Sequence, residues 1–244
     1  MRAETWRLVD DLDRCIDAVG QMDADLALLS EVASGAPPAL RLYRWQPPAL
    51  SLGRFQRDDD VDREECARLG VEVVRRPTGG KALLHGADVT YAVAMPRPDG
   101  AAGSVDAVYC RLAGALVAGL ARLGVEAEIA RHPPKSVFDA AAAVTTRGPV
   151  CNTTMQGADL RVGERKLCGS AQLRRDGAVL QHGSVLLDRL AFDESRLLPT
   201  SGVRAADIRR VTVTMRELGA PHDAWIVAGA LVDGFAETLD VHFS

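Results

Sequence analysis

The chain has 244 residues, 47% of them hydrophobic and 25% charged, with a formal net charge of -4 and a pI near 5.8. This length and balance are typical of a globular chain that buries a full core without disulfide bonds. The slightly acidic charge gives no global reason to bind nucleic acid or an anionic membrane, so we expect neither as a partner.

The sequence shows no targeting segment and no cysteine pair. Residues Met1–Asp11 lack the apolar core of a signal peptide, and no apolar run approaches the roughly eighteen residues of a membrane span. The five cysteines form no CxxC pair, which indicates free thiols in a reducing compartment and no zinc site. We therefore expect a cytoplasmic protein without a bound metal.

Hydrophobic spacing predicts the following elements in chain order. The first are a helix over Ala24–Val32, strands over Leu40–Trp45 and Ala49–Phe55, a short helix over Asp62–Leu69 and a strand over Val71–Val74. Two extended pieces within Lys81–Met95, a helix over Ser104–Leu123 and a strand over Val125–Ala130 follow. The last are a loop over His132–Gly148, three strands within Leu160–Leu187, a strand over Val211–Met215 and a helix over His222–Leu239.

The mixture of hairpins and helices decides the fold class. Turns at Gly163-Glu164 and Asp176-Gly177 break the residues from 160 to 187 into strands that return on themselves. This pattern favours an α+β fold with a mixed, largely antiparallel sheet flanked by helices over a doubly wound parallel sheet. No internal repeat or linker interrupts the sequence, so we expect one domain over residues 1–244.

A basic, glycine-rich segment runs from Arg75 to His85 with the sequence RRPTGGKALLH. Glycines let the backbone approach a ligand closely, and guanidinium and amide groups suit a carboxylate or a phosphate. A solvated basic hairpin is the other interpretation, and composition alone favours it. The segment matches neither a P-loop nor a Rossmann glycine loop.

Three single residues could carry chemistry. Lys166 follows a turn and enters an apolar strand, where it would hold a carbonyl or phosphate oxygen or simply face solvent. His182 precedes Gly183 and would form a pocket wall or a structural contact. Cys151 lies in a loop flanked by proline and glycine, where a nucleophile and a passive thiol are equally open interpretations.

Together these segments resemble the lipoate-protein ligase A-like family, in particular its cysteine-dependent octanoyltransferases. The matching motifs are RRxxGG with a following histidine (Arg75–Gly80 and His85), the lysine motif at residues 163–172, QHG[ST] at Gln181–Ser184, SLGxxQ at Leu50–Gln56, and the first-helix motif at Met22–Leu29. Lys81 departs from the pattern, which usually has glycine or arginine there. Each motif is weak alone, but five in the same order are highly specific.

The resemblance implies a catalytic domain shared with biotin-protein ligases and gives roles to individual residues. Cys151, which lies fifteen residues before Lys166, would be the nucleophile, and Lys166 would contact the acyl carbonyl. The residues expected to bind substrate are Arg75, Arg76, Thr78, Gly79, Gly80, His85, Gly169, Ser170, Ala171, His182 and Gly183.

The expected reaction moves an octanoyl group from acyl carrier protein, through a Cys151 thioester, to a lysine of a lipoyl domain or of glycine-cleavage H protein. This reaction requires no cofactor, and we expect a monomer. The alternatives are a lipoate-protein ligase that uses ATP and Mg²⁺, an octanoyl amidotransferase between lipoyl domains, and a non-catalytic module that binds a fatty acid or cofactor.

Overall fold

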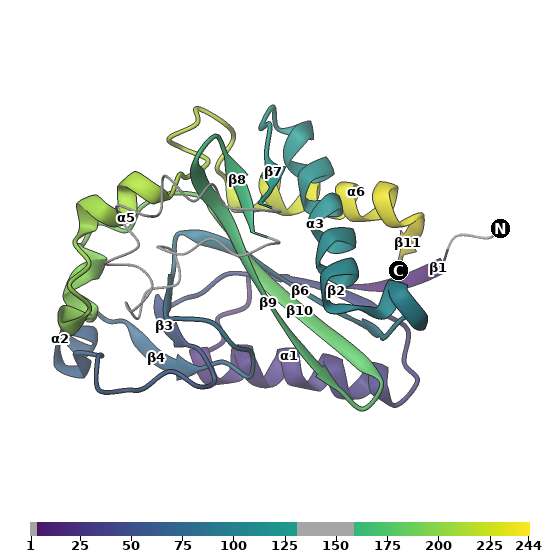
Figure 1. Ribbon diagram of the computed structural model, residues 1–244, viewed down its shortest axis with the longest axis horizontal. Coiled ribbons are helices and arrows are strands. Elements are labelled where there is room, and N and C mark those ends of the chain that lie inside the picture. The colour runs from purple at the N-terminus through teal and green to yellow at the C-terminus, as the bar shows by residue number, and fades with distance from the viewer. Residues whose placement is uncertain (1–3, 131–158) are drawn as a thin grey trace.

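We describe a computed structural model of the protein over residues 4–130 and 159–244 (Figure 1). An eight-stranded sheet has the strand order β11-β1-β2-β6-β10-β9-β8-β7. These strands are β1 (Glu4–Asp11), β2 (Ala39–Tyr43), β6 (Asp88–Pro96), β7 (Glu128–Ile129), β8 (Leu160–Val162), β9 (Arg165–Arg175), β10 (Ala178–Leu186) and β11 (Val241–Phe243). Strand β1 pairs in parallel with β2 and β11, and the other neighbours pair antiparallel. The predicted α+β fold with a mixed, largely antiparallel sheet is therefore confirmed.

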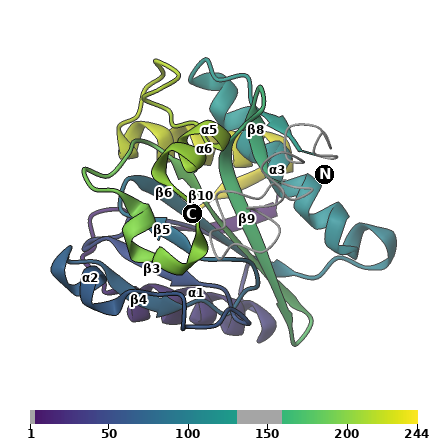
Figure 2. The same ribbon diagram turned by 60° about the vertical axis from the view of Figure 1, so that its left-hand side comes forward.

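A smaller sheet, in the order β4-β3-β5, carries the glycine-rich segment. Its strands are β3 (Ala49–Leu52), β4 (Glu72–Arg75) and β5 (Leu83–His85), and helix α2 (Arg63–Arg68) lies beside β4 (Figure 2). Apolar residues from this sheet, from α2 and from residues 197–208 form a separate hydrophobic cluster. The small sheet therefore has a core of its own and presents the residues between β4 and β5 to the large sheet.

Helices cover both faces of the large sheet (Figures 1 and 2). They are α1 (Ala18–Ala33) on one face, and α3 (Val105–Arg122) and α6 (Ala224–Leu239) on the other. Side chains of a strand alternate between faces, and in β6 Tyr91 and Val93 pack toward α3 and α6, whereas Ala92 and Ala94 pack toward α1. The candidate site lies on the α1 face, where Thr90 of β6 and His182 of β10 line a cavity.

Two glycines allow α3 and α6 to cross with their backbones in contact. A Cβ atom at Gly119 would lie 2.6 Å from the carbonyl oxygen of Ala230, and one at Gly234 would lie 2.4 Å from that of Ala115. Neither position tolerates a side chain without separating the helices. In the described part of the chain, no helix is both long and apolar enough to cross a membrane.

Helix α1 begins six residues before the predicted start at Ala24, because Asp17 caps it by accepting a hydrogen bond from the amide of Gly20. Gln21 and Asp25 are fully buried on the inner face of this helix. These polar residues interrupt the helical spacing of apolar residues, so hydrophobic spacing alone does not predict the first turns of the helix.

Other boundaries also differ from the prediction. Strands β1 and β11 and the short helix α5 (Ala205–Val211) were not predicted. The strand predicted over Val211–Met215 is wrong, since only Thr212 bridges to Lys166 and Val211 ends α5. The predicted strand over Val125–Ala130 shortens to β7. Three 3-10 helices, Gly100–Gly103, Glu194–Leu197 and Pro199–Ser201, complete the described elements, and the loop predicted over residues 132–148 lies outside the described residues.

Candidate active site

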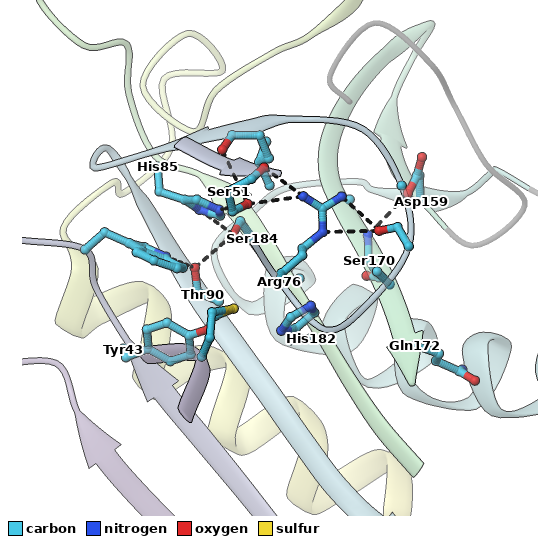
Figure 3. Close-up of a pocket in the computed structure, with 18 of the residues that line it drawn as sticks. Tyr43, Ser51, Arg76, His85, Thr90, Asp159, Ser170, Gln172, His182 and Ser184 are labelled. Carbon is cyan, nitrogen blue, oxygen red and sulfur yellow. Dashed lines mark hydrogen bonds between the residues drawn. The ribbon is translucent and has the colours of Figure 1, made fainter. Parts of the chain in front are cut away.

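A cavity of about 160 Å³ lies between the small sheet and the strands β6, β10 and β9 (Figure 3). Its apolar lining includes Met22, Tyr43, Trp45 and Leu83. The predicted site residues that line it are Arg76, Gly79, Gly80, His85, Lys166, Gly169, Ser170, Ala171, His182 and Gly183. The structure therefore brings together motifs that lie far apart in the sequence.

Lys166 reaches the cavity through an irregularity in strand β9. Arg161 pairs with Lys166 but Leu160 pairs with Cys168, so Leu167 is an extra residue that forms a β-bulge. A bulge shifts the alternation of side chains along a strand and re-aims them. It places Lys166 on the same side as Gly169, where a Cβ atom would lie 2.8 Å from the Lys166 ammonium nitrogen. The glycine of this motif is thus required for the lysine to lie across the strand.

The ammonium group of Lys166 is held in a buried ion pair. Its Nζ lies 2.8 Å from Oδ2 of Asp159, and the two side chains are only 3% and 2% exposed. The other carboxylate oxygen of Asp159 accepts a hydrogen bond from the backbone amide of Ser170, at 3.3 Å. A buried charge pair held by further hydrogen bonds places a fixed positive group in the cavity wall.

None of the cysteines within the described residues lines this cavity. Burial and the nearby Asp159 carboxylate raise the pKa of the Cys168 thiol to about 12, so this cysteine within the lysine motif stays protonated and is a poor nucleophile at neutral pH. Cys66 is also buried, and burial raises its pKa. Cys151, the predicted nucleophile, lies outside the described residues.

The Arg76 side chain stabilises the glycine-rich loop through hydrogen bonds to its backbone. Its guanidinium donates hydrogen bonds to the carbonyl oxygens of Gly79 at 2.9 Å, Lys81 at 2.7 Å and Ser51 at 2.9 Å. Gly80 adopts φ of +96°, and a Cβ there would lie 2.6 Å from the Arg76 guanidinium. Only glycine combines that backbone angle with so close an approach.

Two of the predicted loop residues do not line the cavity. Arg75 points the other way from Arg76, as neighbours at a strand end do, and donates to the carbonyl oxygens of Gly53 and Gln56 and to the carboxylate of Asp58. Thr78 is buried and does not line the cavity, but its hydroxyl contacts His182, which does.

His182 joins the glycine-rich loop to helix α1. Its Nε2 lies 2.8 Å from the hydroxyl of Thr78, and its Nδ1 lies 2.9 Å from Oδ2 of Asp25. Asp25 also accepts from Arg41 at 2.9 Å and from the hydroxyl of Tyr43 at 3.0 Å. Burial, reinforced by the Asp25 charge, raises the pKa of Tyr43 well above its ordinary value, so its hydroxyl stays a donor. This buried network fixes the position of the loop over the cavity.

His85 forms a second network at the other side of the cavity from Asp159 (Figure 3). Its Nδ1 lies 2.8 Å from Oδ2 of Asp88 and its Nε2 lies 2.9 Å from the hydroxyl of Ser51. Burial opposes ionisation of Asp88, but the His85 contacts and the Gly86 amide outweigh it and lower the pKa of this carboxyl. The Trp45 ring stacks on the imidazole at a centroid distance of 4.2 Å.

Several residues of the site were not found from the sequence. Asp159, Asp25, Ser51 and Asp88 each hold a predicted residue in place. Asp25 lies within the first-helix motif and Ser51 within the SLGxxQ motif, so the motifs could have identified both as site residues. No pattern in the sequence marks Asp159 as a site residue, because a single carboxylate before a strand is common on protein surfaces. No group of three or more potential metal ligands occurs in the described ranges.

Comparisons with known proteins show the family that the chain resembles. The family model for the lipoyl protein ligase A/B catalytic domain matches residues 17–235. The octanoyltransferase LipM of Kyrpidia tusciae is 40% identical to the chain, with 97% of this chain and 88% of that protein covered. The octanoyltransferase LipM of Carboxydothermus hydrogenoformans is 36% identical, with 98% and 88% covered.

Solved structures share the fold. Lipoate-protein ligase A bound with ATP superposes with a TM-score of 0.76 at 23% identity, covering 100% of this chain and 88% of that chain. A structure of an archaeal lipoylation system, a bipartite lipoate protein ligase and its E2 lipoyl domain from Thermoplasma acidophilum, gives a TM-score of 0.68 at 22% identity, with 100% and 86% covered.

Proposed function

The chain belongs to the lipoyl protein ligase A/B catalytic domain family, and we propose that it transfers an octanoyl group to a lysine of a lipoyl domain. It is an acyltransferase, as its octanoyltransferase relatives of 36% and 40% identity are. The observation that carries the finer proposal is the buried Lys166 ammonium beside an apolar cavity.

Lys166 stabilises the negative charge that develops on the acyl carbonyl oxygen during transfer. A preorganised cation in a dry cavity acts more strongly than the same cation in water, and it needs no rearrangement as the reaction proceeds. Asp159 holds the ammonium group at its position, at 2.8 Å. Asp159 is therefore a positioning residue in this proposal, and Lys166 is a catalytic one.

The apolar lining accommodates the octanoyl chain. Met22, Tyr43, Trp45 and Leu83 face the same cavity as Lys166. Burial of each methylene contributes about 0.8 kcal/mol, so a medium-length chain gains several kcal/mol from a cavity that it fills. The glycine-rich loop, held by Arg76 and His182, closes over this chain.

In the proposed mechanism, the Cys151 thiolate attacks the thioester of octanoyl acyl carrier protein, and the carrier leaves as a thiolate. The octanoyl group then rests on Cys151 as a thioester. The ε-amine of a lysine in a lipoyl domain or glycine-cleavage H protein attacks next, which forms an amide and releases the cysteine. Exchange of a thioester for an amide is downhill, so the proposal includes no nucleotide and no other cofactor.

A transfer assay tests the proposal. The protein, octanoyl acyl carrier protein and a lipoyl domain are mixed without ATP, and the lipoyl domain is followed by intact mass. We expect it to gain one octanoyl group, and we expect Cys151→Ala to abolish this gain. Cys110→Ala, at a half-buried thiol that does not line the cavity, is the matched control and should retain activity.

Two alternative activities give different outcomes in the same assay. A lipoate-protein ligase would leave the lipoyl domain unmodified until ATP, Mg²⁺ and lipoate are added, and would then release pyrophosphate. An amidotransferase would not use octanoyl acyl carrier protein as donor, but would transfer the octanoyl group from octanoyl H protein to the lipoyl domain. Either result would overturn the proposed donor.

A further inference from the structure

We propose that Ser51, His85 and Asp88 form a second nucleophilic centre, which hydrolyses medium-chain acyl esters and thioesters within the same cavity. The hydroxyl of Ser51 lies 2.9 Å from Nε2 of His85, and Nδ1 of His85 lies 2.8 Å from Oδ2 of Asp88. A nucleophile, an imidazole and a carboxylate in this order define a serine hydrolase triad by geometry, whatever their order in the chain.

The hydrogen bonds around Asp88 fix the direction of the proton on His85. The carboxylate accepts from the amide of Gly86 at 2.8 Å and from the hydroxyl of Thr90 at 3.1 Å. Asp88 titrates below its ordinary range and is ionised at neutral pH. An ionised carboxylate only accepts hydrogen bonds, so Nδ1 of His85 carries the proton and Nε2 is left as a base.

Ser51 is oriented to give its proton to that base. The guanidinium of Arg76 donates to the Ser51 hydroxyl oxygen at 3.2 Å, which occupies one of its lone pairs. The hydrogen of Ser51 then points toward Nε2 of His85, its nearest acceptor. The positive charge of Arg76 also stabilises the partial negative charge that the Ser51 oxygen gains as its proton moves to His85.

The imidazole is held rigidly at the cavity wall. Trp45 stacks on it with an interplanar angle of 18°, and the hydroxyl of Ser184 lies 3.3 Å from its Nδ1. Ser51 and His85 are only 1% and 4% exposed, yet both line the cavity. A substrate therefore reaches this serine only by filling the cavity, which selects an acyl chain that suits the apolar lining.

The reaction proceeds in two balanced steps. The Ser51 oxygen attacks the acyl carbonyl carbon as its proton moves to His85 Nε2, and the bond from carbonyl carbon to the alcohol or thiol leaving group breaks. The leaving group takes the proton from His85, or departs as an anion while His85 releases that proton to solvent, so the imidazole is neutral again. Water then attacks the serine ester, gives a proton to His85, and releases the fatty acid as Ser51 regains its hydrogen.

The test uses the full chain with Cys151→Ala, so that no acyl group transferred to this cysteine contributes. Hydrolysis of p-nitrophenyl octanoate is measured, and an alkyl fluorophosphonate is used to label the nucleophile, whose position is found by peptide mapping. We expect the label on Ser51. We expect Ser51→Ala and His85→Ala to lower hydrolysis by about 10²-fold or more.

Ser30→Ala is the matched control, since Ser30 is an exposed serine of helix α1 that does not line the cavity. It should keep hydrolysis and labelling within a few-fold. Asp88→Asn should lower kcat and leave KM unchanged, because Asp88 positions His85 and does not touch the substrate.

Absence of label from Ser51, or hydrolysis unchanged in a folded Ser51→Ala protein, would overturn this centre. The mapping of the label requires no Ser51 variant, so it decides the matter even if Ser51→Ala does not fold. Neither assay contains acyl carrier protein or a lipoyl domain, so the outcome is independent of the proposed transferase reaction.

Discussion

Replacement of Lys166 by methionine separates the catalytic role of the ammonium group from its structural one. Methionine keeps the length and apolar character of the side chain but leaves the Asp159 carboxylate, which is 2% exposed, without the ammonium at 2.8 Å. Breaking a buried ion pair by removing one partner costs about 3–5 kcal/mol. For a chain of this size each kcal/mol lowers Tm by about 2–4 °C, so Lys166→Met should melt roughly 6–20 °C below the wild type.

The double variant Lys166→Met with Asp159→Asn removes both charges. The amide oxygen of asparagine can still accept the hydrogen bond from the Ser170 amide, so most of the lost stability should return. Transfer of octanoyl to a lipoyl domain, measured by intact mass, should stay about 10²–10³-fold below wild type in both variants, the range for loss of one oxyanion donor. Recovery of transfer along with stability in the double variant would show that Lys166 has only a structural role.

Three further predictions follow from close contacts and charges. Gly169→Ala should lower transfer by about 10²-fold, as measured with the same lipoyl domain, because its Cβ would lie 2.8 Å from the Lys166 ammonium and displace it. Gly119→Ala should lower the free energy of unfolding, measured in urea, by about 1–3 kcal/mol, because its Cβ would meet the backbone of α6. Gly229→Ala should raise the free energy of unfolding by up to about 1 kcal/mol, because its Cβ would have no neighbouring atom within 4 Å. The pKa of Asp88 is lower in the folded protein than in the unfolded chain, where an aspartate titrates at about 3.9. Ionised Asp88 therefore stabilises the folded state at pH values above about 3.9, and this stabilisation is lost as the pH falls through the pKa of Asp88 in the folded protein. The stability gap between wild type and Asp88→Asn, measured by urea unfolding, should thus be full at pH 7 and narrow below about pH 4; a gap that widens in acid would contradict this assignment.

Local signals in the sequence predicted much of the fold. The turns at Gly163 and Gly177, both with positive φ, mark the hairpins β8-β9 and β9-β10 within the predicted residues. Strand β1 was not predicted because it pairs in parallel with both of its neighbours. Parallel neighbours need no adjacent turn, so no hairpin signal marks them.

The site was predicted less completely, because its contacts join distant parts of the chain. Arg75 and Arg76 are equivalent by sequence, and only the register of β4 and its continuation decides which one faces the cavity. Asp25 and His182 are in contact although 157 residues separate them. The bulge that re-aims Lys166 depends on how β8 and β9 pair, which hydrophobic alternation does not reveal.

The acyl-enzyme is the intermediate on which the proposed transfer depends, and a single experiment looks for it. The protein is mixed with octanoyl acyl carrier protein without a lipoyl domain, and its intact mass and peptides are measured. We predict one added octanoyl group, located on Cys151 and removed when a lipoyl domain is added. An unmodified enzyme, in a mixture that still modifies the lipoyl domain once it is present, would contradict the covalent mechanism.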